Sequence, residues 1–253
     1  MHAFFRRSSV QKTAAVLIAL VVWQVGAMAL GDDLILPTPI HVFLRLFTVW
    51  EIKGIFTAIG MSLLRIAAGF FLALVLGSLL AVFAGRFPFV ETLLFPYMAV
   101  VKAVPVVSFI VLAYVWMSSR TIAIFISFLI VLPTVYTGLL SGIKARDGKL
   151  EEMADVFGVS AKDRFLYLRL PNLAPYITSA VSLGAGLAWK SGVAAEIIAV
   201  SAKSIGGLLY SASLEMRNVD LFALTTLLVL LSILFEKLLV VLLRLGFRRL
   251  WSK

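Results

Sequence analysis

The sequence contains no cysteine and only two histidines, His2 and His41, among its 253 residues. A chain without cysteine forms no disulfide and supplies no thiolate to a metal ion. The histidines stand in the N-terminal tail and in a loop, so neither a His/carboxylate metal cluster nor a Ser-His-Asp arrangement is recognisable. We therefore expect no metal site and no catalytic site, and we expect that the chain is not an enzyme.

Charged residues are also scarce, at 14% of the chain, whereas 62% of the residues are hydrophobic and the mean hydropathy is +1.05. A soluble domain of this length buries its core with far less apolar sequence. The composition therefore predicts an all-α membrane protein. The formal charge of +10 is explained by cytoplasmic loops, and we expect no nucleic-acid partner.

A phosphate-binding loop of the type G-x-x-x-x-G-K-[ST] is missing as well. The nearest run begins at Gly184 and ends at Lys190-Ser191, but Trp189 stands where the second glycine must be. The run also lies within an apolar segment and follows no predicted strand. We expect no cofactor in this chain, and a partner must supply the energy if the protein drives uphill transport.

Six apolar runs are long enough to cross a membrane, since about 20 residues span about 30 Å of hydrocarbon. They are residues 13–30, 56–84, 89–117, 121–143, 174–200 and 221–245, and residues 201–220 form a loop. The first run has an alternative interpretation as a cleaved signal peptide, because Ala27-Met28-Ala29 resembles a cleavage site. Its length favours a membrane span. Pro96 and Pro105 exclude a plain straight helix for the third run.

The distribution of Lys and Arg predicts the orientation of these runs. With six spans and a cytoplasmic N-terminus, fourteen of the 23 basic residues lie in inner segments and five lie in outer loops. The remaining four lie in or near the spans. This bias places both termini and the segment 144–171 in the cytoplasm. We expect a single transmembrane permease domain over residues 1–253, with core spans at 56–245.

The longest polar interruption runs from residue 147 to residue 171. Asp147 is suited to cap a helix, and Gly158 is suited to end it. Between them, one apolar stripe is formed by Leu150, Met153, Ala154 and Phe157. Ser160 and Asp163 have the spacing of a capping box for a second short helix. That helix places Ala161, Phe165 and Leu168 on one face, and we expect Pro171 to end it.

The same stretch resembles the EAA loop of ABC-importer permeases. Their pattern is E-A-A, three residues, G, nine residues and I-x-L-P, and here it reads Glu152-Met153-Ala154, then Gly158, then Leu168-Arg169-Leu170-Pro171. Met153 and Leu168 depart from the pattern but remain apolar. The resemblance implies the type I importer fold with a cytoplasmic coupling helix that docks on a separate ATPase. The implied coupling residues are Glu152, Met153, Ala154, Gly158, Ser160, Asp163, Phe165, Leu168 and Pro171.

A second resemblance covers about residues 35–245 and points to the nitrate/sulfonate/taurine/bicarbonate group of these permeases. It rests on Trp189-Lys190-Ser191-Gly192 with Glu196, on Gly206-Gly207, and on Ser62-Leu63-Leu64-Arg65-Ile66. It implies a bacterial inner-membrane importer with a second permease copy, an ATPase dimer that binds ATP and Mg, and an extracytoplasmic binding protein. In this family a helix commonly lies in the interface near residues 40–50. Some relatives carry pyrimidine precursors of thiamine, so that substrate class stays open beside a small anion.

Ionisable residues inside apolar runs are the candidates for the translocation path, because a charge in the bilayer is costly and usually faces the bundle interior or water. They are Lys190, Glu196, Lys102 and Arg65, with Pro105 opening the helix after Lys102. Arg65 is close enough to a span end to snorkel, and Glu196 is also suited to be an interfacial carboxylate. Lys190 and Lys102 favour an anionic substrate.

Two other interpretations stay open at this level. The segment 147–171 is also compatible with a solvated loop that has no partner. The intramembrane charges would equally suit an ion-coupled secondary transporter or a channel. That class leaves the EAA pattern unexplained, and no inverted repeat is apparent in the sequence.

Overall fold

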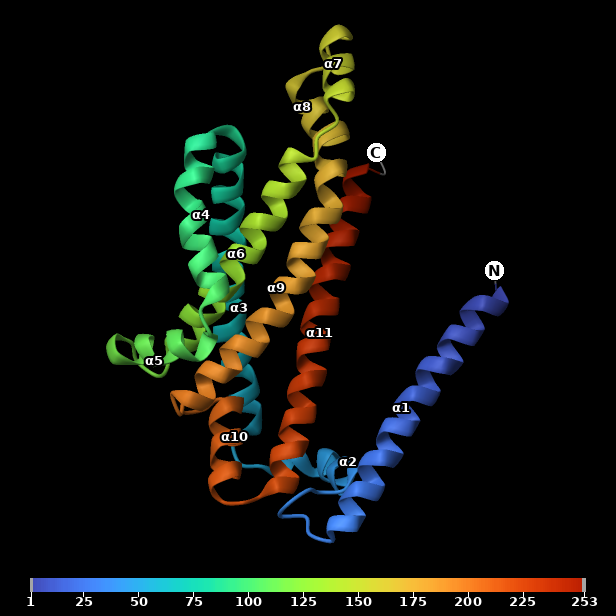
Figure 1. Ribbon diagram of the computed structural model, residues 1–253, viewed down its shortest axis with the longest axis vertical. Helices are drawn as coiled ribbons and strands as arrows, with labels where there is room; N and C mark the ends of the chain where they lie inside the picture. The colour runs from blue at the N-terminus through green and yellow to red at the C-terminus, as the bar shows by residue number, and fades with distance from the viewer. Residues whose placement is uncertain (1, 252–253) are drawn as a thin grey trace.

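The computed structural model describes residues 2–251, and the side chains of residues 10–250. Every regular element in that part of the chain is a helix, which confirms the all-α prediction. Figure 1 shows an elongated molecule whose helices run mostly along its long axis. The segment with α7 (Gly148–Val156) and the C-terminal helix end lie toward one end, and the N-terminal helix points in that direction without reaching it. The helices α2 (Pro39–Thr48) and α10 (Ile205–Leu214) lie at the other end.

The core consists of three long helices, α3 (Ile55–Arg86), α6 (Ile122–Lys144) and α9 (Leu170–Ile198). The α3–α6 and α6–α9 pairs make the most extensive contacts between elements. Small residues allow this close approach of the helices. A Cβ added at Gly69 would lie 2.3 Å from the carbonyl oxygen of Ile124, so the backbones of α3 and α6 meet only because this residue is glycine.

The segment predicted as the third span is broken. It consists of α4 (Pro88–Ala103) and α5 (Val106–Trp116), which meet at an angle of 101°. The break lies at Val104-Pro105, where the proline ring cannot continue the helix and restrains the residue before it to extended conformations. Figure 1 shows α5 turned away from the long axis. The expectation that this segment is no straight helix is confirmed.

The segment 201–220, predicted as a loop, contains the ten-residue helix α10, so that prediction is wrong. Ser204 caps α10 by accepting a hydrogen bond from the backbone N–H of Gly207 at 2.9 Å. Gly206 allows the helix to lie against α9, since a Cβ there would be 2.4 Å from the Cβ of Glu196. The helix is too short to cross a bilayer, and its stability comes from packing against α3, α9 and α11 (Asn218–Trp251).

A helix is present where one was expected, near residues 40–50, since the short helix α2 lies there and packs against α11. Its location in the membrane interface remains a prediction. Thr38 caps α2 by accepting a hydrogen bond from the N–H of His41 at 3.2 Å. Arg45 donates to Asp220 at the start of α11 at 2.5 Å, and a short 3₁₀ turn, η1 (Val49–Glu51), leads to α3. These contacts join α2 to the last helix of the chain.

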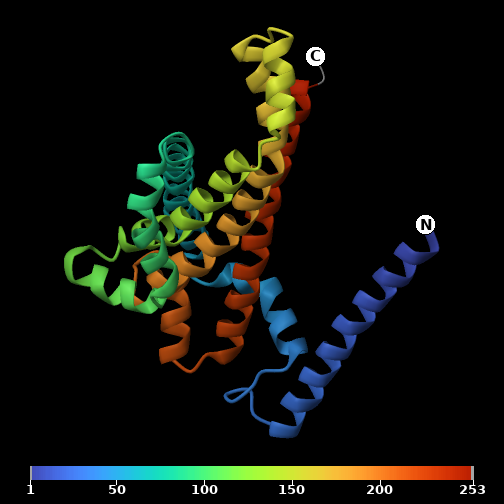
Figure 2. The same cartoon turned by 45° about the horizontal axis from the view of Figure 1, so that its top comes forward.

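The helix α1 (His2–Leu30) diverges from the other helices, as Figures 1 and 2 both show. Among the described elements it makes its main contact with α2. Its apolar part, Val10–Leu30, is only 6% buried in the chain. An apolar helix of this length and exposure is suited to lie in lipid.

Four helical segments within residues 2–251 are long and apolar enough to cross a membrane: Val10–Leu30, α3, α6 and Asn218–Leu250. The bent α4–α5 pair brings the number to five if it counts as one span. The helix α9 has 29 residues, enough to span, but it is less apolar than these and much of its surface is buried in the chain. The multi-pass architecture is confirmed, and the count of six spans remains a prediction.

Candidate functional site

The connection between α6 and α9 projects beyond the bundle as a compact hairpin (Figure 1). This α7–α8 hairpin comprises residues 147–163, with α8 at Ala161–Asp163. The predicted cap at Asp147 is confirmed, because its carboxylate accepts a hydrogen bond from the N–H of Lys149 at 2.9 Å. A cap at this position satisfies one of the free N–H groups of the first turn.

Gly158 ends α7, as the sequence predicts, and has the left-handed φ of +64°. The N–H of Val159 donates to the carbonyl of Ala154 at 2.9 Å, and the N–H of Gly158 donates to that of Asp155 at 3.1 Å. This pair of hydrogen bonds is the Schellman arrangement, in which a glycine reverses the chain at low conformational cost. The position of Gly158 therefore determines the direction in which the chain leaves α7.

The second half of the hairpin begins at Ser160. Its hydroxyl accepts a hydrogen bond from the N–H of Asp163 at 3.1 Å and donates to the Asp163 carboxylate at 2.7 Å. The capping residue and its partner are as predicted. However, the Asp163 carboxylate accepts a hydrogen bond from the Ser160 hydroxyl, and not from the Ser160 backbone N–H as in a standard capping box. Both ends of the hairpin turn are thus held by local hydrogen bonds.

The second short helix, which begins after Ser160, was expected to end at Pro171. It does not end there, so that prediction is wrong. The chain continues from α8 through a π-helical segment, η2 (Arg164–Arg169), directly into α9. The N–H of Leu170 donates to the carbonyl of Phe165, five residues earlier, which is the π-type pattern. Pro171 lies in the first turn of α9, where its fixed φ is compatible with a helix. The hairpin is consequently in continuous helical connection with a core helix.

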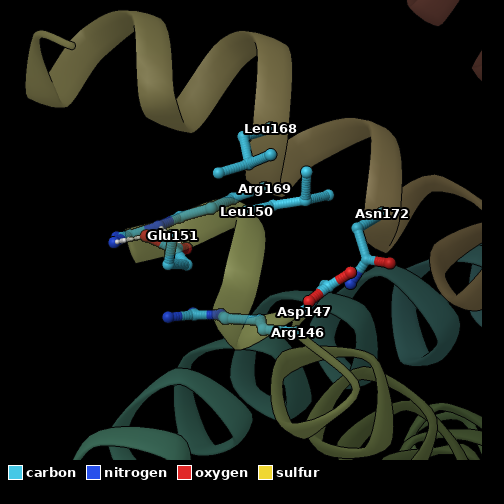
Figure 3. Close-up of a pocket in the computed structure, with 7 residues that line it drawn as sticks. All are labelled: Arg146, Asp147, Leu150, Glu151, Leu168, Arg169 and Asn172. Atoms are coloured by element: carbon cyan, nitrogen blue, oxygen red, sulfur yellow. Dashed lines mark hydrogen bonds and ion pairs between the residues drawn. The ribbon is translucent and has the colours of Figure 1, made fainter. Parts of the chain in front are cut away.

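A cluster of ion pairs fixes the hairpin to the start of α9 (Figure 3). Arg169 forms a two-point contact with Glu151 of α7, from Nε at 2.8 Å and from Nη2 at 3.0 Å. Arg164 lies 3.6 Å from the same carboxylate and 2.6 Å from Asp155. The paired geometry of guanidinium and carboxylate adds directional specificity to the charge attraction. We call the contact between Arg169 and Glu151 the clamp. It prevents α7 from rotating freely about its connections.

Hydrogen bonds from Arg169 lower the pKa of Glu151 below its usual range, against the opposing effect of partial burial. The positive charges of Arg169, Arg164 and Arg146 act in the same direction as the hydrogen bonds. Glu151 therefore stays ionised at neutral pH and keeps its contact with Arg169. A cavity of about 40 Å³ lies beside this contact, bordered by Asn172 and Leu150 among others.

The end of the hairpin carries an apolar surface that the rest of the chain leaves uncovered. We call it the apolar tip, and it consists of Met153, Val156, Phe157 and Val159. Val156 is 83% exposed and Phe157 is 76% exposed. Of the predicted stripe, Ala154 packs inward, whereas Met153 and Phe157 face outward. Glu152 and Phe165 are exposed as well, and Leu168 is half-buried. An exposed apolar patch of this kind is typical of a surface that contacts a protein or a membrane.

Two predicted path residues occupy the protein interior. Glu196 is fully buried, and it accepts hydrogen bonds from the Ser62 hydroxyl at 2.6 Å and the N–H of Gly206 at 3.3 Å. Arg65 is 5% exposed and lies 3.5 Å from the same carboxylate. The expectation that Arg65 snorkels to the membrane edge is therefore wrong. The contacts join α3, α9 and α10 and favour a structural role for the pair.

The two intramembrane lysines have different surroundings from this pair. Lys190 on α9 and Lys102 at the end of α4 are both exposed on the surface of the chain. Lys102 donates to the Thr137 hydroxyl of α6 at 3.2 Å. Pro105 forms the N-terminal boundary of α5, next to the break that follows Lys102. These residues remain candidates for the translocation path.

The sequence interpretation missed the partners that complete these contacts. Arg169 and Glu151 belong to the clamp, and Ser62 belongs to the buried cluster. An alternation of acidic and basic residues between 151 and 169 is the only signal that pointed to the clamp. The partner of Glu196 lies in another helix, so no local pattern indicates it.

Several long apolar helices, packed around a buried charged pair, define a polytopic membrane protein. Residues 73–251 match the family of binding-protein-dependent transport system inner membrane components. The chain belongs to this family. It is a permease subunit of an ABC importer in the bacterial inner membrane, it has no catalytic activity of its own, and the ATPase is a separate subunit.

Relatives with known names support this placement. The chain is 30% identical to the nitrate import permease protein NrtB of Synechococcus elongatus over 76% of this chain and 71% of the relative. It is 29% identical to the taurine transport system permease protein TauC of Escherichia coli, over 79% and 74%. It is 24% identical to the formylaminopyrimidine transport permease protein ThiX of Halalkalibacterium halodurans, over 71% and 72%. The relatives' names thus cover an inorganic anion, a sulfonate zwitterion and a pyrimidine.

Proposed function

We propose that the α7–α8 hairpin is the coupling element that transmits movement from a cytoplasmic ATPase dimer to the membrane helices. The apolar tip is the observation that carries this proposal. It exposes Val156 and Phe157 beside ionised groups, as a surface that packs in a groove would. The Arg169–Glu151 clamp and the unbroken helix into α9 support it further, because a rigid connection transmits displacement.

The proposed mechanism is alternating access of two permease copies, each contributing one hairpin. Binding of ATP and Mg by the ATPase dimer draws the hairpins together, and hydrolysis releases them. Because η2 continues into α9, a displacement of the tip rotates or shifts the helix that carries Lys190. An extracytoplasmic binding protein delivers the substrate at the opposite end, near α2 and α10. The chain functions as a single permease domain.

A small anion is the proposed substrate. The relatives named for nitrate and taurine are more similar to this chain than the one named for a formylaminopyrimidine. Lys102 and Lys190 supply positive charge on apolar helices, where an unpaired ammonium is costly unless it meets water or an anion. Uptake of labelled nitrate, taurine and a formylaminopyrimidine by cells that express the whole transporter would separate these possibilities. We expect uptake of nitrate, or of taurine through its anionic sulfonate group, and no uptake of the pyrimidine.

The substitution Phe157→Asp tests the coupling proposal. It places a charge at the centre of the apolar tip, and we expect it to abolish co-purification of the ATPase and to reduce uptake at least tenfold. Met216→Asp is a matched control for the co-purification, because Met216 is 69% exposed and lies beside α10 at the opposite end of the molecule. Normal ATPase binding and normal uptake in the Phe157 variant would overturn the proposal and favour a solvated loop.

A further inference from the structure

A cavity of about 250 Å³ lies between α4 and α6. Its lining includes Lys102 and Met98 from α4 and Tyr136 and Thr137 from α6. The volume exceeds that of several water molecules, at about 30 Å³ each. The cavity is therefore large enough for a small polar solute.

Tyr136 contributes an unpaired donor to this cavity. Its side chain is only 3% exposed, and its phenolic oxygen has no hydrogen-bond partner among the described residues. A buried hydroxyl without a partner costs free energy, and such groups are normally satisfied by a neighbour, a water molecule or a ligand. Since Tyr136 lines the cavity, we expect its partner to be a molecule that occupies it.

Lys102 contributes the charge. Its ammonium group donates to the Thr137 hydroxyl at 3.2 Å, and that hydroxyl in turn donates to the carbonyl of Pro133 at 2.7 Å. Thr137 is thus an acceptor that orients the ammonium, which has two further N–H groups available. The side chain is exposed on an apolar helix. Because lipid would penalise that charge, this face of the chain borders water or a polar solute.

The acidic residue beside the cavity does not cancel this charge. Glu91 lines the same cavity, but its carboxylate is paired with Lys144 at the end of α6, at 2.6 Å to each oxygen. With Glu91 paired, the Lys102 ammonium is the uncompensated charge of the cavity. A positive charge beside a neutral hydroxyl donor is suited to an oxyanion and repels a cation.

We propose that Lys102 and Tyr136 form an anion subsite between α4 and α6, which holds a small oxyanion through a charge-assisted hydrogen bond and a neutral hydroxyl hydrogen bond. Thr137 is a positioning residue that aims the ammonium. The proposal rests on the proposed function and deepens it, because it assigns the anion preference to a particular pair of side chains. The subsite lies next to the α4–α5 break, where the polypeptide chain bends by 101°.

The absence of cysteine makes a direct test possible, since a single introduced thiol is the one cysteine of this chain and its labelling is read on this chain. Ala99 lines the cavity, and Ala99→Cys is a small change. Two methanethiosulfonate reagents are applied to the complete transporter, one bearing a sulfonate and one bearing a trimethylammonium group. After division by their rates with a free thiol, we expect the sulfonate reagent to react at least tenfold faster, and nitrate to slow the reaction.

Further variants assign this preference to the proposed residues. Lys102→Met is expected to remove the tenfold preference and Lys102→Arg to retain it. Tyr136→Phe is expected to raise the nitrate concentration needed for protection at least fivefold, with the preference retained. The matched control is Val100→Cys, at an exposed neighbouring position, whose rates these variants should leave unchanged.

Equal reaction of both reagents at Ala99→Cys, or an unchanged ratio in Lys102→Met, would overturn the proposal. Failure of the subsite and failure of the proposed function are distinguishable. If the Ala99→Cys transporter still imports an anion and binds its ATPase but shows no charge preference, the subsite alone is wrong. If the preference is present but Phe157→Asp leaves uptake intact, the coupling proposal alone is wrong.

Discussion

At the scale of single residues, burial separates charges that look equivalent in the sequence. Arg65, Glu196 and Lys190 all interrupt apolar runs, and each was a reasonable candidate for the path. Glu196 and its partner Ser62 lie 134 positions apart, so only the folded chain reveals that the carboxylate joins α3 to α9. Lys190, six positions from Glu196 on the same helix, stays on the surface.

The buried pair leads to a prediction about stability. Glu196→Leu leaves the Arg65 guanidinium buried without its partner, and breaking a buried pair in this way costs about 3–5 kcal/mol. We expect a marked fall in the thermal unfolding temperature of the detergent-solubilised protein. Replacing both residues by leucine should recover much of the loss, because no lone charge then remains. Lys190→Leu is the control, and an equal fall in that variant would contradict the structural role of the pair.

At the scale of elements, local patterns predicted the hairpin well. The caps at Asp147 and Ser160 and the stop at Gly158 depend on neighbouring residues only, and all three are present. The π-helical segment and α10 were not predictable in this way. A π-helix depends on how the hairpin and α9 are joined, and α10 is stabilised by packing against three other helices.

The left-handed backbone conformation of Gly158 leads to a second prediction. Gly158→Ala introduces a Cβ at a φ of +64°, which costs about 1–2 kcal/mol. We expect faster hydrogen exchange in residues 148–163 and weaker coupling of ATP hydrolysis to uptake. Gly148→Ala is a matched control within the same hairpin, because Gly148 has no left-handed φ and a Cβ there meets open space. Similar exchange in both variants would contradict the role of the turn.

At the scale of the whole molecule, the two ends differ in character. The hairpin end carries the apolar tip, and the other end carries α2 and α10 with the Arg45–Asp220 contact (Figure 1). The helical class and most of the apolar runs were predictable from hydropathy, since each run is contiguous in sequence. The sharp α4–α5 bend, the inclusion of α9 in the core and the divergent α1 were not, because they depend on contacts between distant segments.

The apolar tip is proposed to contact an ATPase subunit, and a crosslink tests this contact most directly. A photoreactive phenylalanine analogue replaces Phe157 in cells that express the whole transporter, and Met216 at the other end carries the analogue in the control. We predict an adduct between position 157 and a protein with a phosphate-binding loop, and no such adduct from position 216. If position 157 forms no adduct with the ATPase while the transporter imports its substrate, the hairpin is not the coupling element.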